Sequence, residues 1–211
     1  IAVMVRNQDA RSKDYDEVKA KARTGHADDM WKEKFSHSDH RGGGRSSGRE
    51  TLCRVIAGSI AQMMVGKISP QTEVVGVTTQ IGSICHPLEN MSPLEFEKFL
   101  NSNLAQLTTS QVDQFATRMP DANKNAEIER LLLDAKANGK SYGGKVRIFI
   151  KNPPKYLGQP VFHKFKSDLG AAFMSIGATS GVSLGIGDGA AAEEGSQFHA
   201  QSGSAQIGRA S

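Results

Sequence analysis

The sequence predicts an α+β fold, and three observations favour it. Segments with apolar residues three or four positions apart, typical of amphipathic helices, alternate loosely with runs rich in β-branched residues. The order of these segments contains no βαβ repeat of the kind that builds a parallel sheet. The 211 residues, of which 38% are hydrophobic and 23% charged, suit a single globular domain over residues 1–211.

The N-terminal stretch IAVMV, residues 1–5, is predicted to be a buried apolar strand. It has no initiator methionine and no preceding turn, so we expect it to be cut from a longer polypeptide. Residues 7–15 are predicted to form a polar loop, and residues 16–21 a short helix.

A glycine-rich stretch that runs into a helix, residues 41–64 (RGGGRSSGRETLCRVIAGSIAQMM), is the most informative part of the chain. Ser47 and Glu50 have the spacing of a capping box, which predicts that the helix begins at Ser47. The positions with helical spacing are Leu52, Val55, Ile56, Ser59, Ile60 and Met63.

The same stretch has the features of an anion-binding cradle. Glycines let the backbone approach a ligand closely, and a helix N-terminus presents unpaired N–H groups. Arg45 and Arg49 add forked donors suited to phosphate or carboxylate, beside Ser46 and Ser47. On local physics alone, an ordinary glycine-rich loop with solvated arginines explains the pattern equally well. It is not a Walker A loop, since no Gly-Lys-Ser/Thr follows the glycines.

The elements that follow are predicted from local signals. Residues 73–84 (EVVGVTTQIGSI) are predicted to be β-like, from their partial alternation and β-branched residues, and Ser92, Pro93 and Glu95 are predicted to begin a capped helix. Residues 122–138 predict a helix that ends at Asn138-Gly139, and residues 145–151 a half-buried strand.

Near the C-terminus, a helix is predicted from Pro160 and a final strand over residues 181–187. The apolar stripe of the helix is expected to be core rather than a cofactor contact, and comprises Phe162, Phe165, Leu169, Phe173 and Ile176. GIGDGA, from residue 185, has the spacing of a glycine fingerprint. It is discounted as a dinucleotide site because it lies in no βαβ unit.

Other site classes find less support. Histidines and aspartates gather between residues 26 and 40, but without a recognised metal-ligand spacing, so no metal site is predicted. Cys53 and Cys85 are predicted to be free thiols in a reducing compartment such as the cytoplasm. No apolar run approaches the roughly 18 residues of a membrane span. The net charge of +4 suits a polyanionic small substrate as readily as nucleic acid.

Six segments of the chain occur in the order of a known family. They are RNQDARSKDY (residues 6–15), GHAD (25–28), RGGGRSSGRE (41–50), YGGKV (142–146), LGQPVFHKF (157–165) and FMSIGATSGVSLGIGDG (173–189). Together they resemble chorismate synthases, in which the third segment usually reads RGGGRSSARE. The segments are distributed from residue 6 to residue 189 in the family's order, so chance does not explain the agreement.

The resemblance implies a β-α-β sandwich, with helices between two antiparallel sheets, assembled as a homotetramer. It implies the conversion of 5-enolpyruvylshikimate 3-phosphate to chorismate by anti 1,4-elimination of phosphate. Reduced FMN is required in this family although the reaction has no net redox change. Neither a nucleic acid nor a membrane is expected as a partner.

The resemblance also implies roles around the substrate and the flavin. His26, the histidine of GHAD, is expected to be the catalytic residue that serves the reduced flavin as a hydrogen-bond or proton donor. Arg49 is expected to bind anionic groups of the substrate, with Arg41 and Arg11 as further candidates.

The flavin itself is expected to be held from two places in the chain. These are the glycine-rich stretch, through Arg45, Ser46 and Ser47, and the C-terminal tail, through Ser202 and Gly203. This assignment also comes from the resemblance.

The chain departs from the family pattern in several places. The family's N-terminal FGESHG segment and its later C-terminal portion have no counterpart, and the tail GSQFHA (195–200) lacks the family's acidic residues. Gly48 replaces the usual alanine. Two alternatives therefore stay open. One is a catalytically incomplete homologue, and the other is a module whose basic loop binds nucleic-acid phosphate, although few aromatics interleave with its basic residues.

Overall fold

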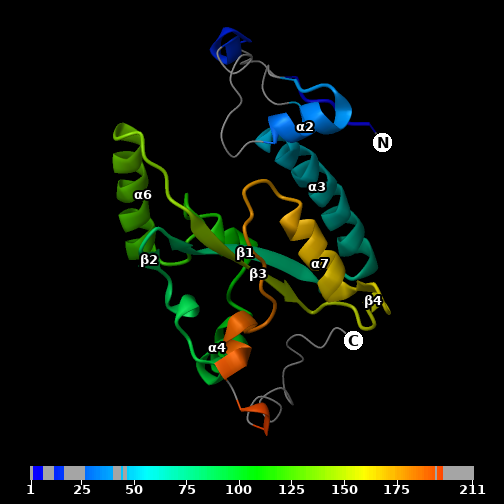
Figure 1. Ribbon diagram of the computed structural model, residues 1–211. Helices are drawn as coiled ribbons and strands as arrows, with labels where there is room; N and C mark the ends of the chain where they lie inside the picture. The colour runs from blue at the N-terminus through cyan, green and yellow to red at the C-terminus, as the bar shows by residue number, and fades with distance from the viewer. Residues whose placement is uncertain are drawn as a thin grey trace. The chain divides into compact units, whose positions relative to one another are not determined.

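The computed structural model describes residues 2–6, 12–16, 27–39, 44, 47–192 and 194–196 (Figure 1). These residues fall into two compact units. The first contains residues 1–67 and 167–182, and the second contains residues 68–166 and 183–211. Helices occur in both units and antiparallel strands in the second, which confirms the predicted α+β class.

The first unit is helical. Among its described residues, the α-helices are α2 (Asp28–Phe35), α3 (Thr51–Ile68) and α7 (Phe165–Met174), and the 3-10 turns include η1 (Ser12–Tyr15) and η3 (Gly48–Glu50). The last residue of α3 and the first two of α7 belong to the second unit. Helix α3 confirms the helix predicted from the sequence, but none of its residues is buried. Its apolar side chains include Val55, 60% exposed, and Met63, 64% exposed.

The second unit is built on a three-stranded antiparallel sheet. Its strands are β1 (Glu73–Ile81), β2 (Ile84–Cys85) and β3 (Gly144–Lys151), in the order β2-β1-β3. Figure 1 shows β1 and β3 side by side. The β-like character predicted over residues 73–84 is confirmed, and Gly82, with a φ of +56°, turns the chain back between β1 and β2. A Gly-Ser pair inside a β-like run is itself a hairpin signal.

Helices and short turns surround this sheet. They are η4 (Pro87–Glu89), α4 (Pro93–Asn103), α5 (Thr109–Val112), α6 (Ala122–Ala137) and η5 (Gly187–Ala192). Both strong helix predictions are confirmed. Ser92 and Glu95 form the expected capping box of α4. Helix α6 ends with Asn138 as C-cap, followed by Gly139 at a φ of +62°.

Three other predictions are wrong. The helix expected from Pro160 begins only at Phe165, because a small hairpin of β4 (Gly158–Gln159) and β5 (His163–Lys164) precedes it. Residues 181–187 form no strand and lead into η5. Residues 2–6 form no strand either and are exposed. An extended apolar segment becomes a strand only when a partner strand pairs with it, and these segments have none among the described residues.

The core lies on one face of the sheet. Val75, Val77 and Phe149 project from β1 and β3 toward Leu88 and Phe96, and each of these five side chains is at most 7% exposed. The Phe96 and Phe149 rings stack with centroids 6.4 Å apart. Burying one such side chain contributes about 1.5–3 kcal/mol. This cluster therefore accounts for much of what holds the second unit together.

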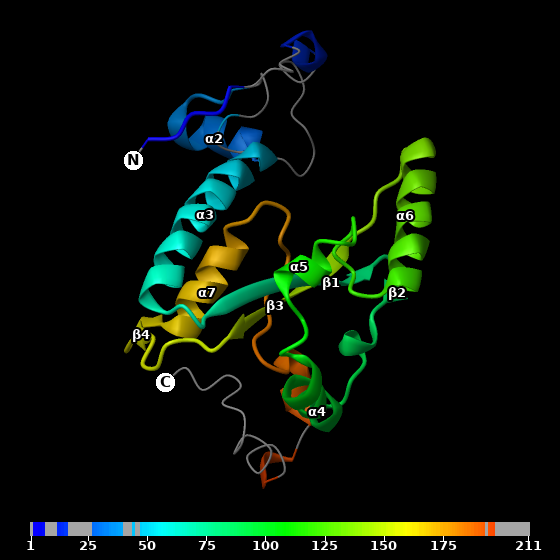
Figure 2. The same cartoon turned by 180° about the vertical axis from the view of Figure 1, so that it is seen from behind.

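A loop protects the edge of β1 that β2 leaves unpaired. The Arg118 backbone has a φ of +57°, and its carbonyl accepts the Thr78 N–H at 3.0 Å. The Arg118 side chain donates from Nε and Nη2 to the Gly76 carbonyl at 3.2 and 3.1 Å. Helix α5 lies beside the same strand, as the view from behind shows (Figure 2). The Thr78 N–H and the Gly76 carbonyl at this edge of β1 are thus satisfied within the unit.

A buried lysine joins the sheet to the loop after α4. The Lys151 side chain is 9% exposed, and its Nζ lies 2.6 Å from Oε2 of Glu73. The same Nζ donates to the Leu107 carbonyl at 2.9 Å and to the Leu104 carbonyl at 3.4 Å. The hydrogen bond from Lys151 holds the pKa of Glu73 below its usual value.

Candidate anion-binding site

The helix formed by η3 and α3 begins at the residue that the sequence predicts, Ser47. Ser47 is the N-cap of η3, with an extended backbone at φ −72° and ψ 141°. Its Oγ accepts a hydrogen bond from the Arg49 backbone N–H at 3.2 Å. The predicted capping box would have used the N–H of Glu50, which instead donates to the Ser47 carbonyl at 3.0 Å. The first turn is therefore a tight 3-10 turn that continues into α3.

Arg49 carries its charge at this helix start. Its side chain is exposed, and its Nη2 donates to the hydroxyl of Tyr15 at 3.2 Å. Tyr15 is the last residue of η1 and lies 34 positions earlier in the chain. Among the described residues, no carboxylate pairs with Arg49. The neutral phenol thus holds the guanidinium without neutralising it, which leaves the charge available to an anion.

Arg54, one and a half helical turns further on, has a different role. Its Nε and Nη2 donate to Oγ and the carbonyl of Ser175 at 3.1 and 2.6 Å, and its Nη1 donates to the Glu50 carbonyl at 3.2 Å. Ser175 directly follows the last residue of α7. Arg54 thus caps the C-terminal end of α7 and ties it to the start of α3, so its donors are used for structure.

The structure describes two of the predicted site residues. Ser47 and Arg49 are brought together by the hydrogen bond at the helix start. The other predicted site residues lie outside the described residues: His26, Arg11, Arg41, Arg45, Ser46, Ser202 and Gly203. Their roles stay predictions.

Sequence reasoning missed two residues that shape the site. Arg54 follows Glu50 by four positions, so its contact with the Glu50 carbonyl could have been read from helical spacing. Its contact with Ser175 spans 121 positions and has no local signal. Tyr15 closes a segment that resembles the chorismate synthase pattern, but only the structure links it to Arg49.

A separate hollow lies in the second unit. This open hollow has a volume of about 390 Å³ between α4, α5 and the residues around His86, and Phe99 and Phe115 are among the residues that line it. Its lining contains amide and apolar side chains but no Lys, Arg, Asp or Glu. This composition does not suit a polyanionic substrate, so we do not place the anion site there.

His86, at the wall of this hollow, gives a pH-dependent prediction. Its Nδ1 accepts the Leu88 N–H at 3.2 Å and so caps η4. Burial lowers the pKa of His86 from 6.5, as do the charges of Lys124 and Arg147, against the opposing charges of Asp121 and Glu89. Protonation is therefore less favourable in the folded state. The contribution of His86 to the free energy of unfolding is fully present above pH 6.5 and falls as the pH drops toward the lowered pKa.

The matched variant is His86→Asn, because an asparagine side chain caps a helix without titrating. Urea unfolding of both proteins is measured between pH 7.5 and pH 5, an interval that contains the pKa of an unperturbed histidine, about 6.5. The free energy of unfolding should fall more steeply with decreasing pH in the wild type than in His86→Asn. If the free energies of unfolding of the two proteins depended on pH in the same way, this role of His86 would be contradicted.

The described residues offer little to other site types. No group of three or more His, Cys, Asp or Glu side chains among them could hold a metal ion. Cys53 and Cys85 are free cysteines, as predicted. No described helix is both long enough and apolar enough to cross a membrane.

Solved structures identify the fold. A protein described as "Crystal Structure of Chorismate Synthase" superposes with a TM-score of 0.69 at 26% sequence identity. The match covers 82% of this chain and 51% of that chain. The fold is thus of the chorismate synthase type.

The sequence comparisons agree. The family model described as chorismate synthase matches residues 1–208. A chorismate synthase of Bdellovibrio bacteriovorus is 50% identical over 199 residues, which are 94% of this chain and 54% of the relative. One of Christiangramia forsetii is 37% identical over 89% of this chain and 48% of the relative. The chain belongs to the chorismate synthase family, and it spans about half the length of the curated relatives it matches.

Proposed function

We propose that the protein converts 5-enolpyruvylshikimate 3-phosphate to chorismate and inorganic phosphate. In this anti 1,4-elimination, the C–O bond to phosphate and one C–H bond break, and a second ring double bond forms. The observation that carries the proposal is the 50% identity over 94% of the chain to a protein named chorismate synthase. The whole protein's activity rests on this likeness and on the chemistry of the described site.

Arg49 supports this function because its donors suit the substrate. The substrate carries two carboxylates and a phosphate, so a pocket for it needs cationic donors placed before binding. The Arg49 guanidinium is exposed and hydrogen-bonded only to a neutral hydroxyl among the described residues. In this proposal Arg49 binds an anionic group of the substrate, and Arg41 and Arg11 add further positive charge.

The described residues also fit a phosphate-bearing cofactor. The Ser47 Oγ accepts the Arg49 N–H and keeps its own hydroxyl proton for a phosphate oxygen. Ser47 would hold FMN together with Arg45, Ser46, Ser202 and Gly203, and His26 would donate a hydrogen bond or proton to it. Reduced FMN, when bound, lends an electron transiently and takes up the departing hydrogen.

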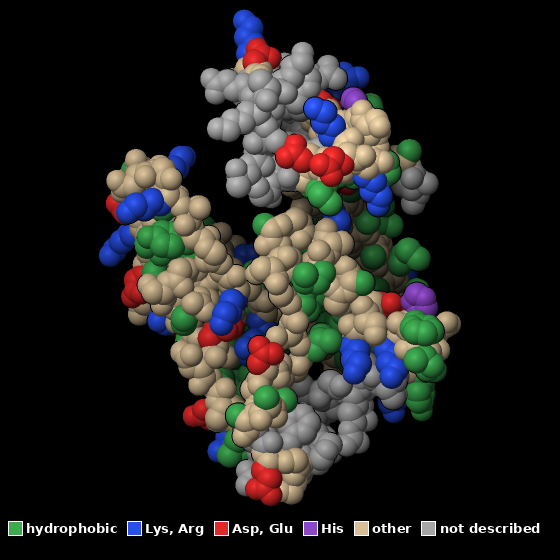
Figure 3. All heavy atoms as spheres, viewed as in Figure 1, with side chains coloured by type: hydrophobic (Ala, Val, Ile, Leu, Met, Phe, Trp, Pro, Cys, Tyr) green, Lys and Arg blue, Asp and Glu red, His purple; other side chains and the backbone are tan. Residues whose placement is uncertain are grey.

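The proposal extends to partners and location. By likeness to the family, the protein assembles as a homotetramer in the cytoplasm, without nucleic acid or membrane. Acidic and basic side chains are interspersed on the face that Figure 3 shows, which does not favour a nucleic-acid surface. Light scattering of the purified protein measures the assembly, and a monomer at micromolar concentration would contradict the tetramer.

The decisive experiment is an anaerobic assay of the protein in its full natural length. Reduced FMN and 5-enolpyruvylshikimate 3-phosphate are supplied, and chorismate is followed by absorbance. We expect chorismate formation that needs the reduced flavin and is lost in His26→Ala, while the Arg130→Ala control on α6 keeps it. Arg130 is an exposed residue far along the chain from the proposed site.

The other outcomes separate the alternatives. A flavin spectrum that changes on addition of substrate, without chorismate, would identify a catalytically incomplete homologue. Neither turnover nor a flavin response would contradict the proposal. In that case, oligonucleotide affinity that falls steeply with salt would favour the nucleic-acid-binding module.

A further inference from the structure

The hydroxyl of Tyr15 is the one described group that fixes the direction of the Arg49 side chain. The contact is 3.2 Å long, from Nη2 of Arg49 to Oη of Tyr15. An exposed arginine without a partner loses rotamer freedom when it binds a ligand, which weakens binding. A hydrogen bond made beforehand reduces this loss. Tyr15 therefore preorganises Arg49.

The proton of the same hydroxyl remains available. A phenol can accept one hydrogen bond and donate another at the same time. Tyr15 accepts from Arg49, and no acceptor for its own proton occurs among the described residues. A tyrosine that is half-buried commonly finds a partner for this proton, and an anion beside Arg49 would be such a partner.

The contrast with Arg54 supports this interpretation. Arg54 donates to two backbone carbonyls and to the hydroxyl of Ser175, whose own proton is given to the Ala172 carbonyl at 2.6 Å. Among the described residues, the Arg49 side chain contacts only the Tyr15 hydroxyl, whose proton has no described acceptor. Two arginines five positions apart thus differ in chemistry. Three donors of Arg54 are used within the protein, whereas Arg49 is paired with a second potential donor to an anion.

We infer that Tyr15 belongs to the anion site and donates its hydroxyl proton to the oxyanion that Arg49 binds. The inference rests on the proposed function in assigning Arg49 to an anionic group of the substrate. The group is an oxyanion, either a phosphate or a carboxylate. Tyr15 contacts it directly and also orients Arg49 toward it.

The test measures oxyanion binding without turnover. Inorganic phosphate, which is also the leaving group of the proposed reaction, is titrated calorimetrically into the full-length wild type, Tyr15→Phe, Arg49→Ala and the double variant. Acetate is titrated in parallel to represent a carboxylate. Loss of a hydrogen bond to a charged group should weaken binding in Tyr15→Phe about 10-fold.

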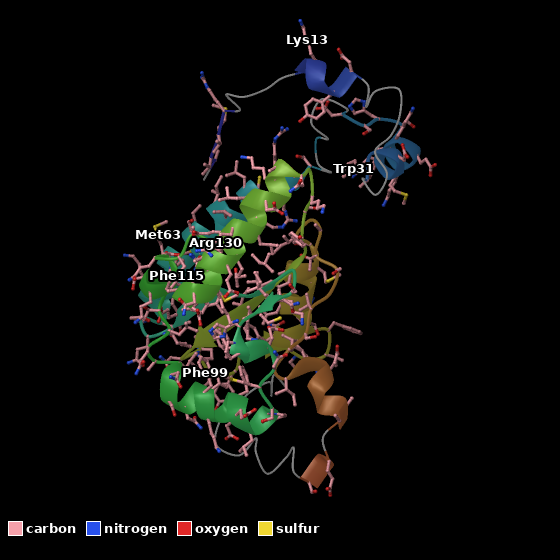
Figure 4. All side chains as sticks on the ribbon, turned by 90° about the vertical axis from the view of Figure 1, so that its left-hand side faces the viewer. Lys13, Trp31, Met63, Phe99, Phe115 and Arg130 are labelled. Carbon is pink, nitrogen blue, oxygen red and sulfur yellow. The ribbon has the colours of Figure 1, made fainter. Side chains whose placement is uncertain are left out.

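A double-mutant cycle separates this role from a structural one. Because both side chains bind one anion, Tyr15→Phe should have little further effect in the Arg49→Ala background. Lys13→Gln is the matched control, since Lys13 lies on the same turn and extends away from its ribbon (Figure 4). It should bind phosphate almost as the wild type does. The coupling energy between the two substitutions is measured with each anion. A larger value with phosphate identifies the oxyanion as a phosphate, and a larger value with acetate identifies it as a carboxylate.

Several results would overturn the inference. The first is that neither anion binds the wild type, and the second is that Tyr15→Phe binds the anion as the wild type does. The third is that Tyr15→Phe lowers the anion affinity equally in the presence and absence of Arg49. Failure of the proposed function looks different. It would leave the coupled loss of anion binding in place while no chorismate forms.

Discussion

Replacing Arg49 by alanine is expected to raise the KM for 5-enolpyruvylshikimate 3-phosphate by about 30- to 700-fold, which corresponds to about 2–4 kcal/mol. The physical reason is that the variant removes a forked cation that no described carboxylate neutralises. Stability should change little, because the exposed side chain makes a single hydrogen bond to the described residues. Steady-state kinetics with saturating reduced FMN measures the effect.

Two variants make this prediction sharper. Arg49→Lys keeps the charge but loses the planar fork, so an intermediate KM is expected. Arg130→Ala on α6 removes an arginine that is also exposed, and the KM of this variant should stay at the wild-type value. If the KM of Arg49→Ala matched that of Arg130→Ala, Arg49 would have no role in binding the substrate.

Replacing Lys151 by methionine is expected to lower the free energy of unfolding by about 2–3 kcal/mol. Removing one member of a buried pair costs about 3–5 kcal/mol, and the partial exposure of Glu73 reduces this figure. The variant also leaves the carbonyls of Leu104 and Leu107 without their ammonium donor. Urea unfolding at pH 7 measures the loss.

The pH dependence of this loss identifies its origin. The pKa of Glu73 is lowered in the folded state, so the stabilisation it provides is present above its usual pKa of 4.5 and disappears as the pH falls through the lowered value. The difference between wild type and Lys151→Met should therefore shrink in acid. The exposed Lys155→Met is the control and should unfold as the wild type does. A difference independent of pH would show that packing alone is responsible.

Local signals predicted the capped helices α4 and α6 well. Ser92 with Glu95 and Asn138 with Gly139 act through neighbouring backbone groups, so their effect can be read from a few residues. The strands were harder to predict. Residues 181–187 look like a strand by composition, but a strand also needs a partner, and composition does not provide one.

At the site, too, local contacts could be predicted from the sequence and long-range contacts could not. Ser47 was correctly placed at the helix start, because its capping bond reaches only to Arg49. The contacts of Tyr15 with Arg49 and of Ser175 with Arg54 join segments that are 34 and 121 positions apart. No local rule contains such distances. The resemblance to a family marked these segments as important, and the geometry gives two of their residues a physical role.

The pairing of β1 with β3 affects how fast the second unit can fold. Thr79 and Lys145 contact each other although they are 66 positions apart. Helices α4 and α6, which lie between them, carry their own caps and can form in the unpaired chain. Contacts between distant positions slow folding, because the entropy of closing the loop is lost before the contacts form. Strand pairing is therefore expected to be the rate-limiting step, and mutations in β1 or β3 should change the folding rate more than mutations in α6.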